Sequence, residues 1–141
     1  MYLDTSYIAK VYLAEPESPR VRETVGKADV RRSSVWVFTE FHAVLHRRMR
    51  EGSLAASDAR SLALRFADDV EGGLWTLLPL TEGLLRRTSA LILAAPAGLF
   101  LRAGDALHLT TASEAGEREV WTGDRHMRAA AAYFGLRGRS V

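Results

Sequence analysis

The stretch that decides the fold is residues 1–16, MYLDTSYIAKVYLAEP, in which a short apolar run ends in an acid and a helical pattern follows at once. Residues 1–3 are predicted to form a strand, because they are a brief apolar run. Residues 6–15 are predicted to form a helix, since Ile8, Val11 and Tyr12 recur at helical spacing. Asp4 therefore closes a strand and precedes a helix. A carboxylate at the end of so short a strand needs an explanation.

The alternation of strand and helix continues along the chain. Further strands are predicted at residues 30–35, at the apolar run 74–80, which suits a buried parallel strand, and at residues 119–122. Ser18 and Thr81 are predicted helix caps, and Gly52 and Gly135 are predicted helix stops. The helices are predicted at 19–28, 36–52, 53 or 57 to 71, 81 to about 95, 104–116 and 123–135. This order predicts an α/β sandwich with a mostly parallel sheet, as a single domain over residues 1–141.

Composition excludes several classes of protein. The 141 residues include no cysteine, which excludes a disulfide framework, a thiolate metal site and a cysteine nucleophile, and is compatible with a reducing cytoplasm. No basic segment leads into an apolar stretch at the start, and no apolar run approaches the ~20 residues that cross a bilayer, so we expect a cytoplasmic protein. Of the 19 basic residues only Lys10 and Lys27 are lysine. Arginine suits phosphate, so this bias is compatible with nucleic-acid binding without establishing it.

Four acids are predicted to meet at one edge of the sheet. The carboxyl ends of parallel strands share an edge, and the helix after each strand begins there. Asp4 and Asp124 follow predicted strands, and Asp105 lies in the first turn of the helix that leads into residues 119–122. Glu40 lies about one turn into the helix after residues 30–35, at the border of its apolar stripe.

Each aspartate also has a structural explanation, because an acid at a helix start satisfies free N–H groups and suits the helix dipole. The proximity of all four acids favours a functional explanation instead. Carboxylates held close together repel each other, and their pKa values rise unless a cation lies among them. Carboxylate oxygens without thiolate or histidine partners favour Mg²⁺ or Mn²⁺, ions that also take phosphate oxygens as ligands.

Phosphodiester hydrolysis is the chemistry that such a site predicts, because a bound ion polarises the phosphoryl oxygen and lowers the pKa of a bound water. The predicted metal ligands are Asp4, Asp105 and Asp124. Glu40 is predicted either to orient or deprotonate the attacking water or to ligate a second ion. Either one or two ions are compatible with this set.

Two hydroxyls accompany the acids. Ser6 and Thr122 could hydrogen-bond a carboxylate, a water or a phosphate, and they also suit a helix cap and a strand end. His42 and His46 are spaced as zinc ligands often are, but His42 lies about 160° around its helix from Glu40, so surface or interface positions are expected for both. His108 lies one turn after Asp105 and is expected to be a core histidine that supports the acidic site.

Four segments carry a resemblance to a known family. They are MYLDTSYIAKVYLAEP at 1–16, FTEFHAVLHRR at 38–48, LRAGDALHLTTA at 101–112 and VWTGDRHMRAAAAYFGL at 120–136. In this order they resemble the acidic motifs of PIN-domain ribonucleases, and particularly of the VapC-type toxins of bacterial toxin–antitoxin pairs. The resemblance spans nearly the whole chain.

The resemblance implies a three-layer α/β/α sandwich around a five-stranded, mostly parallel sheet. It implies an Mg²⁺-dependent endoribonuclease whose site consists of Asp4, Glu40, Asp105 and Asp124. It also implies an RNA substrate, a homodimer and a small antitoxin protein that blocks the site.

Two other classes compete with this interpretation. A phosphatase of the haloacid dehalogenase type also begins with an aspartate at a strand end, but it needs a second aspartate two residues later, where this chain has Ser6. A non-catalytic PIN-like module would bind RNA or a partner through the same surface without cutting. Measuring activity separates that alternative from the enzyme.

Overall fold

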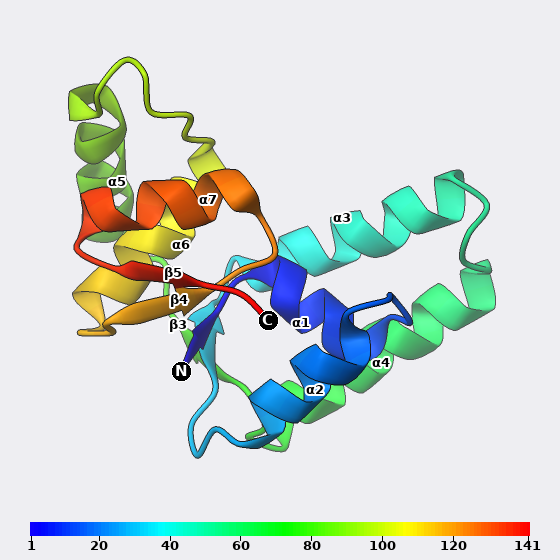
Figure 1. Ribbon diagram of the computed structural model, residues 1–141. Helices are drawn as coiled ribbons and strands as arrows, with labels where there is room; N and C mark the ends of the chain where they lie inside the picture. The colour runs from blue at the N-terminus through cyan, green and yellow to red at the C-terminus, as the bar shows by residue number, and fades with distance from the viewer.

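A computed structural model describes residues 1–141, and its strands and helices alternate as the sequence predicts (Figure 1). Five parallel strands form one sheet in the order β3-β2-β1-β4-β5. Their bounds are Tyr2–Leu3 for β1, Arg32–Ser34 for β2, Thr76–Leu78 for β3, Glu119–Trp121 for β4 and Arg137–Arg139 for β5. The predicted five-stranded parallel sheet is therefore confirmed.

Seven α-helices and one 3₁₀-helix connect the strands. Their bounds are Thr5–Tyr12 for α1, Ser18–Gly26 for α2, Val37–Arg50 for α3, Ala56–Glu71 for α4, Glu82–Ala94 for α5, Ala103–Glu114 for α6, Arg125–Ala130 for α7 and Ala131–Phe134 for η1. Helix α3 ends before Gly52, whose positive φ of 71° suits a residue without a side chain. None of the helices combines the length and the apolar character needed to cross a membrane.

The helices form two layers because neighbouring residues of a strand point to opposite faces of the sheet. Leu3 belongs to a core cluster built from α1, α2, α3 and α4, whereas Tyr2 belongs to a second cluster built from α6, α7 and η1. Figure 1 shows the first group of helices on one side of the sheet and α5, α6 and α7 on the other. The three-layer sandwich predicted from the sequence is confirmed.

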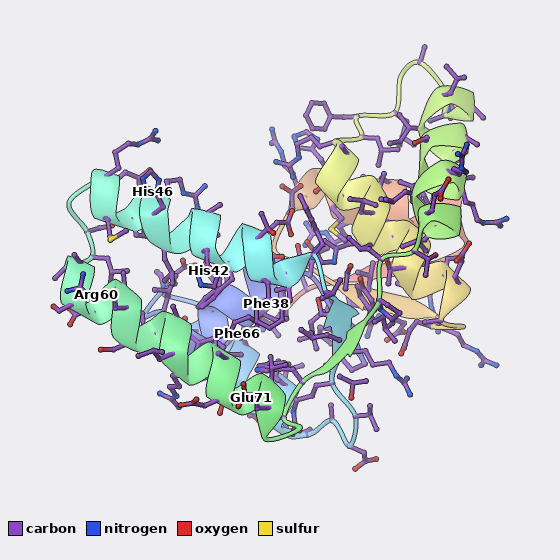
Figure 2. All side chains as sticks on the ribbon, turned by 180° about the vertical axis from the view of Figure 1, so that it is seen from behind. Phe38, His42, His46, Arg60, Phe66 and Glu71 are labelled. Carbon is purple, nitrogen blue, oxygen red and sulfur yellow. The ribbon has the colours of Figure 1, made fainter.

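Helices α3 and α4 form a long antiparallel pair. Figure 2 shows Phe38 of α3 and Phe66 of α4 pointing toward each other between the two helices, and their ring centroids lie 5.3 Å apart. Phe66 is fully buried and also contacts Tyr12 of α1. Aromatic packing therefore fixes this pair to the first helix, while His42 and His46 are exposed on α3.

The structure corrects four local predictions. The apolar run 74–80 forms only the short β3, which is parallel as predicted but lies at the edge of the sheet and is partly exposed, so the prediction of a buried strand is wrong. Strand β5 was not expected at its residues, because the sequence Arg-Gly-Arg lacks an apolar pattern. Ser18 does not cap α2: its hydroxyl donates to the Leu13 carbonyl and accepts from the Glu15 N–H. The helix predicted at 123–135 is divided into α7 and η1.

Candidate active site

Asp4 is held at the junction of β1 and β4, the two adjacent strands at the centre of the sheet. Its N–H donates to the Trp121 carbonyl at 3.0 Å, which extends the pairing of β1 with β4 by one residue. Its carboxylate caps α1 by accepting from the Tyr7 N–H at 3.1 Å. The backbone on both sides of Asp4 is thus in regular structure, which fixes the direction of the carboxylate.

The two hydroxyls that the sequence singled out, Ser6 and Thr122, both donate to Asp4. The distances are 2.7 Å from Ser6 and 2.8 Å from Thr122. Each hydroxyl also accepts from the backbone after β4: Ser6 from the Gly123 N–H at 2.8 Å and Thr122 from the Asp124 N–H at 2.9 Å. They therefore tie Asp4 to the loop that carries Asp124.

Asp4 is only 6% exposed. Burial raises its pKa, against the opposing effects of His108 and of the hydroxyl and N–H donors. No arginine or lysine is bonded to it. The surroundings of Asp4 therefore stabilise its ionised form less well than water does.

Glu40, in the first turn of α3, is held from two sides through one oxygen. His108 Nε2 lies 2.8 Å from Oε2, and the Thr5 hydroxyl donates to the same atom. Oε1 faces Gly104 so closely that a Cβ there would lie 2.6 Å away. Burial raises the pKa of Glu40, but the bonds from His108 and Thr5 outweigh it, so the pKa lies below its usual range and the carboxyl is ionised.

His108 is a buried histidine that links the sheet to the site, as expected from the sequence. Its Nδ1 lies 3.0 Å from the Tyr2 hydroxyl, and the pKa of Tyr2 is raised by burial, so this hydroxyl keeps its proton. The other ring nitrogen, Nε2, donates to the ionised carboxylate of Glu40. His108 thus connects the buried phenol of Tyr2 to the carboxylate of Glu40.

Asp105 and Asp124 share one basic partner, Arg102. Arg102 precedes α6, and its guanidinium donates to both oxygens of Asp105, at 2.7 and 3.0 Å, and to Asp124. Asp124 caps α7 by accepting from the N–H groups of His126 and Met127. Burial raises the pKa of Asp124, but the Met127 N–H and Arg102 lower it below its usual range. The same two aspartates raise the pKa of Arg102, Asp105 most of all.

All four predicted acids line one groove of about 640 Å³ at the carboxyl edge of the sheet, where α1, α3 and α7 begin close together (Figure 1). Three basic side chains, Lys10, Arg47 and Arg102, lie in the same groove. No three acidic or histidine side chains are placed to hold one metal ion together. Arg102 lies between Asp105 and Asp124, and Glu40 is bonded to His108. The groove thus gathers the acids without forming a ready ligand cluster.

The donor set nevertheless fits a hard divalent cation. The acidic side chains supply only oxygen ligands, which Mg²⁺ and Mn²⁺ prefer. A cationic group, the guanidinium of Arg102, already lies against two of them. The site therefore has the charge and the ligand chemistry of a cation site.

Sequence reasoning missed Arg102, Thr5 and Gly104. Arg102 had a usable signal, because it stands three residues before Asp105 at the start of a helix, a spacing at which side chains meet. Thr5 and Gly104 had none, since their importance comes from Glu40, which is distant in the sequence.

Comparison with known proteins identifies the family of the chain. A family model described as the PIN domain matches residues 1–133. The chain belongs to the PIN domain family. Among solved structures, this PIN domain is similar to the crystal structure of VapC20 from Mycobacterium tuberculosis, which is described as a sarcin–ricin loop cleaving toxin. The TM-score is 0.74 at 16% sequence identity, over 96% of this chain and 98% of that one. A search of curated proteins finds no match.

Proposed function

We propose that this PIN domain is a metal-dependent endoribonuclease that acts as the toxin of a VapC-type toxin–antitoxin pair. One observation carries the proposal: four carboxylates from the starts of four helices line a single groove that also contains basic side chains. Membership of the PIN family and the similarity in fold to VapC20, itself described as a toxin that cleaves an RNA loop, support it. The substrate would be RNA.

Asp4, Asp105 and Asp124 would hold the ion, Mg²⁺ or Mn²⁺. When bound, the ion would polarise a phosphoryl oxygen and lower the pKa of a bound water. Asp4 contributes a carboxylate that is rigidly placed by Ser6, Thr122 and the Tyr7 N–H. A rigid anion is suited to this purpose because ligand geometry has to be right before the substrate arrives.

Glu40 would orient the attacking water or accept its proton. His108 and Thr5 both donate to Oε2, so Oε1 is the oxygen that carries neither of these bonds. The lowered pKa keeps Glu40 ionised, as a proton acceptor must be. The other role open to Glu40 is that of ligand to a second ion.

The partners that we propose follow from the VapC-type assignment. They are an antitoxin protein that covers the groove and a second copy of the chain in a homodimer. The working compartment would be the cytoplasm.

Cleavage of cellular RNA tests this function. The purified chain, freed of any bound partner, is incubated with total RNA and Mg²⁺ or Mn²⁺, with and without EDTA. Asp4→Asn is compared with Asp58→Asn, which makes the same chemical change at an exposed position in the first turn of α4. Contaminating nuclease would be present equally in both preparations.

We expect cleavage by the wild type and by Asp58→Asn, no cleavage by Asp4→Asn, and no cleavage in EDTA. Equal behaviour of all three proteins across metals would contradict catalysis. That result would favour the non-catalytic module, which binding of RNA without cutting would then identify.

A further inference from the structure

The guanidinium of Arg102 lies between two of the four carboxylates. Its Nε donates to Asp105 Oδ2 at 2.7 Å, and a terminal nitrogen donates to Asp105 Oδ1 at 3.0 Å and to Asp124. Both oxygens of Asp105 and one oxygen of Asp124 are therefore engaged by a single cation. A planar fork of donors is well matched to carboxylates, so this is a specific contact.

We propose that Arg102 is a built-in competitor of the divalent metal, whose guanidinium holds Asp105 and Asp124 until an ion displaces it. Resting on the function proposed above, this assigns to Arg102 a role in setting metal affinity. A metal ion needs the same carboxylate oxygens that Arg102 occupies. Two cations bound to the same atoms would also repel each other. The arginine-bound state and the metal-bound state of the carboxylates therefore exclude one another.

The exposure of the three side chains supports an exchange in which Arg102 is the group that moves. The Arg102 side chain is 53% exposed, against 12% for Asp105 and 26% for Asp124. Arg102 also precedes α6 with an extended backbone, at φ −90° and ψ 156°, so its side chain can turn to solvent without disturbing the helix. The aspartates lie in or next to helices and stay in place.

In the absence of metal, Arg102 also performs the ion's electrostatic role. Asp105 and Asp124 come from the beginnings of α6 and α7, and neighbouring carboxylates would otherwise push these ends apart. The contact keeps the two ligands close, at the expense of metal affinity. The two effects of removing Arg102 are therefore opposite: weaker folding without metal and tighter binding of metal.

Direct measurement of Mn²⁺ binding tests this role without using activity. Free Mn²⁺ is followed by electron paramagnetic resonance during titration of the wild type and Arg102→Met. The matched control is Arg87→Met, which removes an arginine that also joins two helices, through Glu114, outside the groove. We expect Arg102→Met to bind Mn²⁺ about tenfold more tightly than the wild type, within the usual range for coupled binding events, and Arg87→Met to bind like the wild type.

A second variant keeps the test valid if Arg102→Met folds poorly. Arg102→Lys retains the charge but lacks the planar fork, so we expect an affinity between those of the wild type and Arg102→Met. Thermal unfolding in EDTA and in Mn²⁺ gives a second readout, because tighter metal binding to the folded state raises Tm by a larger increment.

The outcomes separate the two proposals. Tighter Mn²⁺ binding by the Arg102 variants, with a larger Mn²⁺-dependent rise in Tm, supports competition. Equal or weaker binding by these variants, with the wild type binding normally, overturns the role of Arg102 and leaves the metal-dependent function standing. Failure of every protein, wild type included, to bind Mn²⁺ overturns the metal-dependent function and this role with it.

Discussion

Gly104 is the residue that leaves room for Glu40. A Cβ at this position would lie 2.6 Å from Oε1, which is closer than real Cβ atoms come to another heavy atom. Gly104→Ala should therefore push the carboxylate away from its bonds with His108 and Thr5. We expect RNA cleavage to fall about a hundredfold, as small displacements of a catalytic group often cause.

Gly83→Ala is the matched control for this prediction. Gly83 is the second residue of α5 as Gly104 is the second residue of α6, and a Cβ there would meet only the Thr81 hydroxyl at 3.8 Å. Both variants replace glycine with a better helix former. Equal activity of Gly104→Ala and Gly83→Ala would show that Glu40 does not depend on the close fit.

We expect the buried carboxylate of Asp4 to lower the free energy of unfolding of the protein. Burial raises its pKa in the native state. At pH values between the ordinary pKa and this raised pKa, the native state therefore binds more protons than the unfolded state. Stability contributed by this group is then present at low pH and lost as pH rises through the raised pKa. Asp4→Asn removes the buried charge, and asparagine still caps a helix.

We therefore expect Asp4→Asn to be more stable than the wild type by about 1 kcal/mol at neutral pH in EDTA. The difference in Tm should shrink as the pH is lowered to where the wild-type carboxyl is protonated. Thermal unfolding of both proteins across this range measures it. A variant less stable than the wild type at neutral pH would mean that the hydrogen bonds to Asp4 outweigh its burial.

At the scale of elements, one chain of hydrogen bonds joins α1, β3 and α4. The buried indole of Trp75, next to β3, donates to the Tyr12 hydroxyl at 2.6 Å, and this hydroxyl donates to Asp69 of α4 at 2.7 Å. Tyr12→Phe leaves the indole N–H of Trp75 without its acceptor. We expect it to cost about 2 kcal/mol and to lower Tm by roughly 7 °C.

Tyr133→Phe is the comparison for this loss, because the Tyr133 hydroxyl makes a single bond, to the Leu91 carbonyl, and is partly exposed. Its effect on Tm should be clearly smaller in the same thermal melts. Similar losses in both variants would show that the three-residue chain adds nothing beyond one ordinary hydrogen bond.

The elements were predictable where local pattern and topology agree. The strand, acid and helix order of residues 1–16 placed Asp4 at the carboxyl edge, and parallel pairing of β1 with β4 then required Asp124 to lie nearby. Strand β5 could not be predicted, because its pairing with β4 rather than any apolar pattern defines it. The contacts of Arg102 and the orientation of Glu40 depend on side-chain packing between distant segments, which periodicity does not report.

At the scale of the whole molecule, the distribution of charge matters more than its sum. The net charge is only +2, yet the groove combines the four predicted acids and Glu15 with Lys10, Arg47 and Arg102. Lys10 is paired with Glu15 and Glu17 at 3.7 and 3.0 Å. On the function proposed above, we expect the basic side chains of the groove to bind RNA phosphates and the carboxylates to bind the ion.

The combined variant Lys10→Met/Arg47→Met tests whether these two basic side chains bind phosphate. In an Asp4→Asn background, in which we propose that RNA is not cut, it should bind single-stranded RNA more weakly, and the slope of log K against log salt should fall by about 1.4, the value for two lost phosphate contacts. Lys27→Met/Arg86→Met is the control, since both residues are exposed, lie outside the groove and pair only within i,i+4 contacts. Fluorescence anisotropy over a range of salt measures both slopes. If the two combined variants share one slope, the basic residues of the groove do not contact phosphate, and the RNA must approach the carboxylates over another surface.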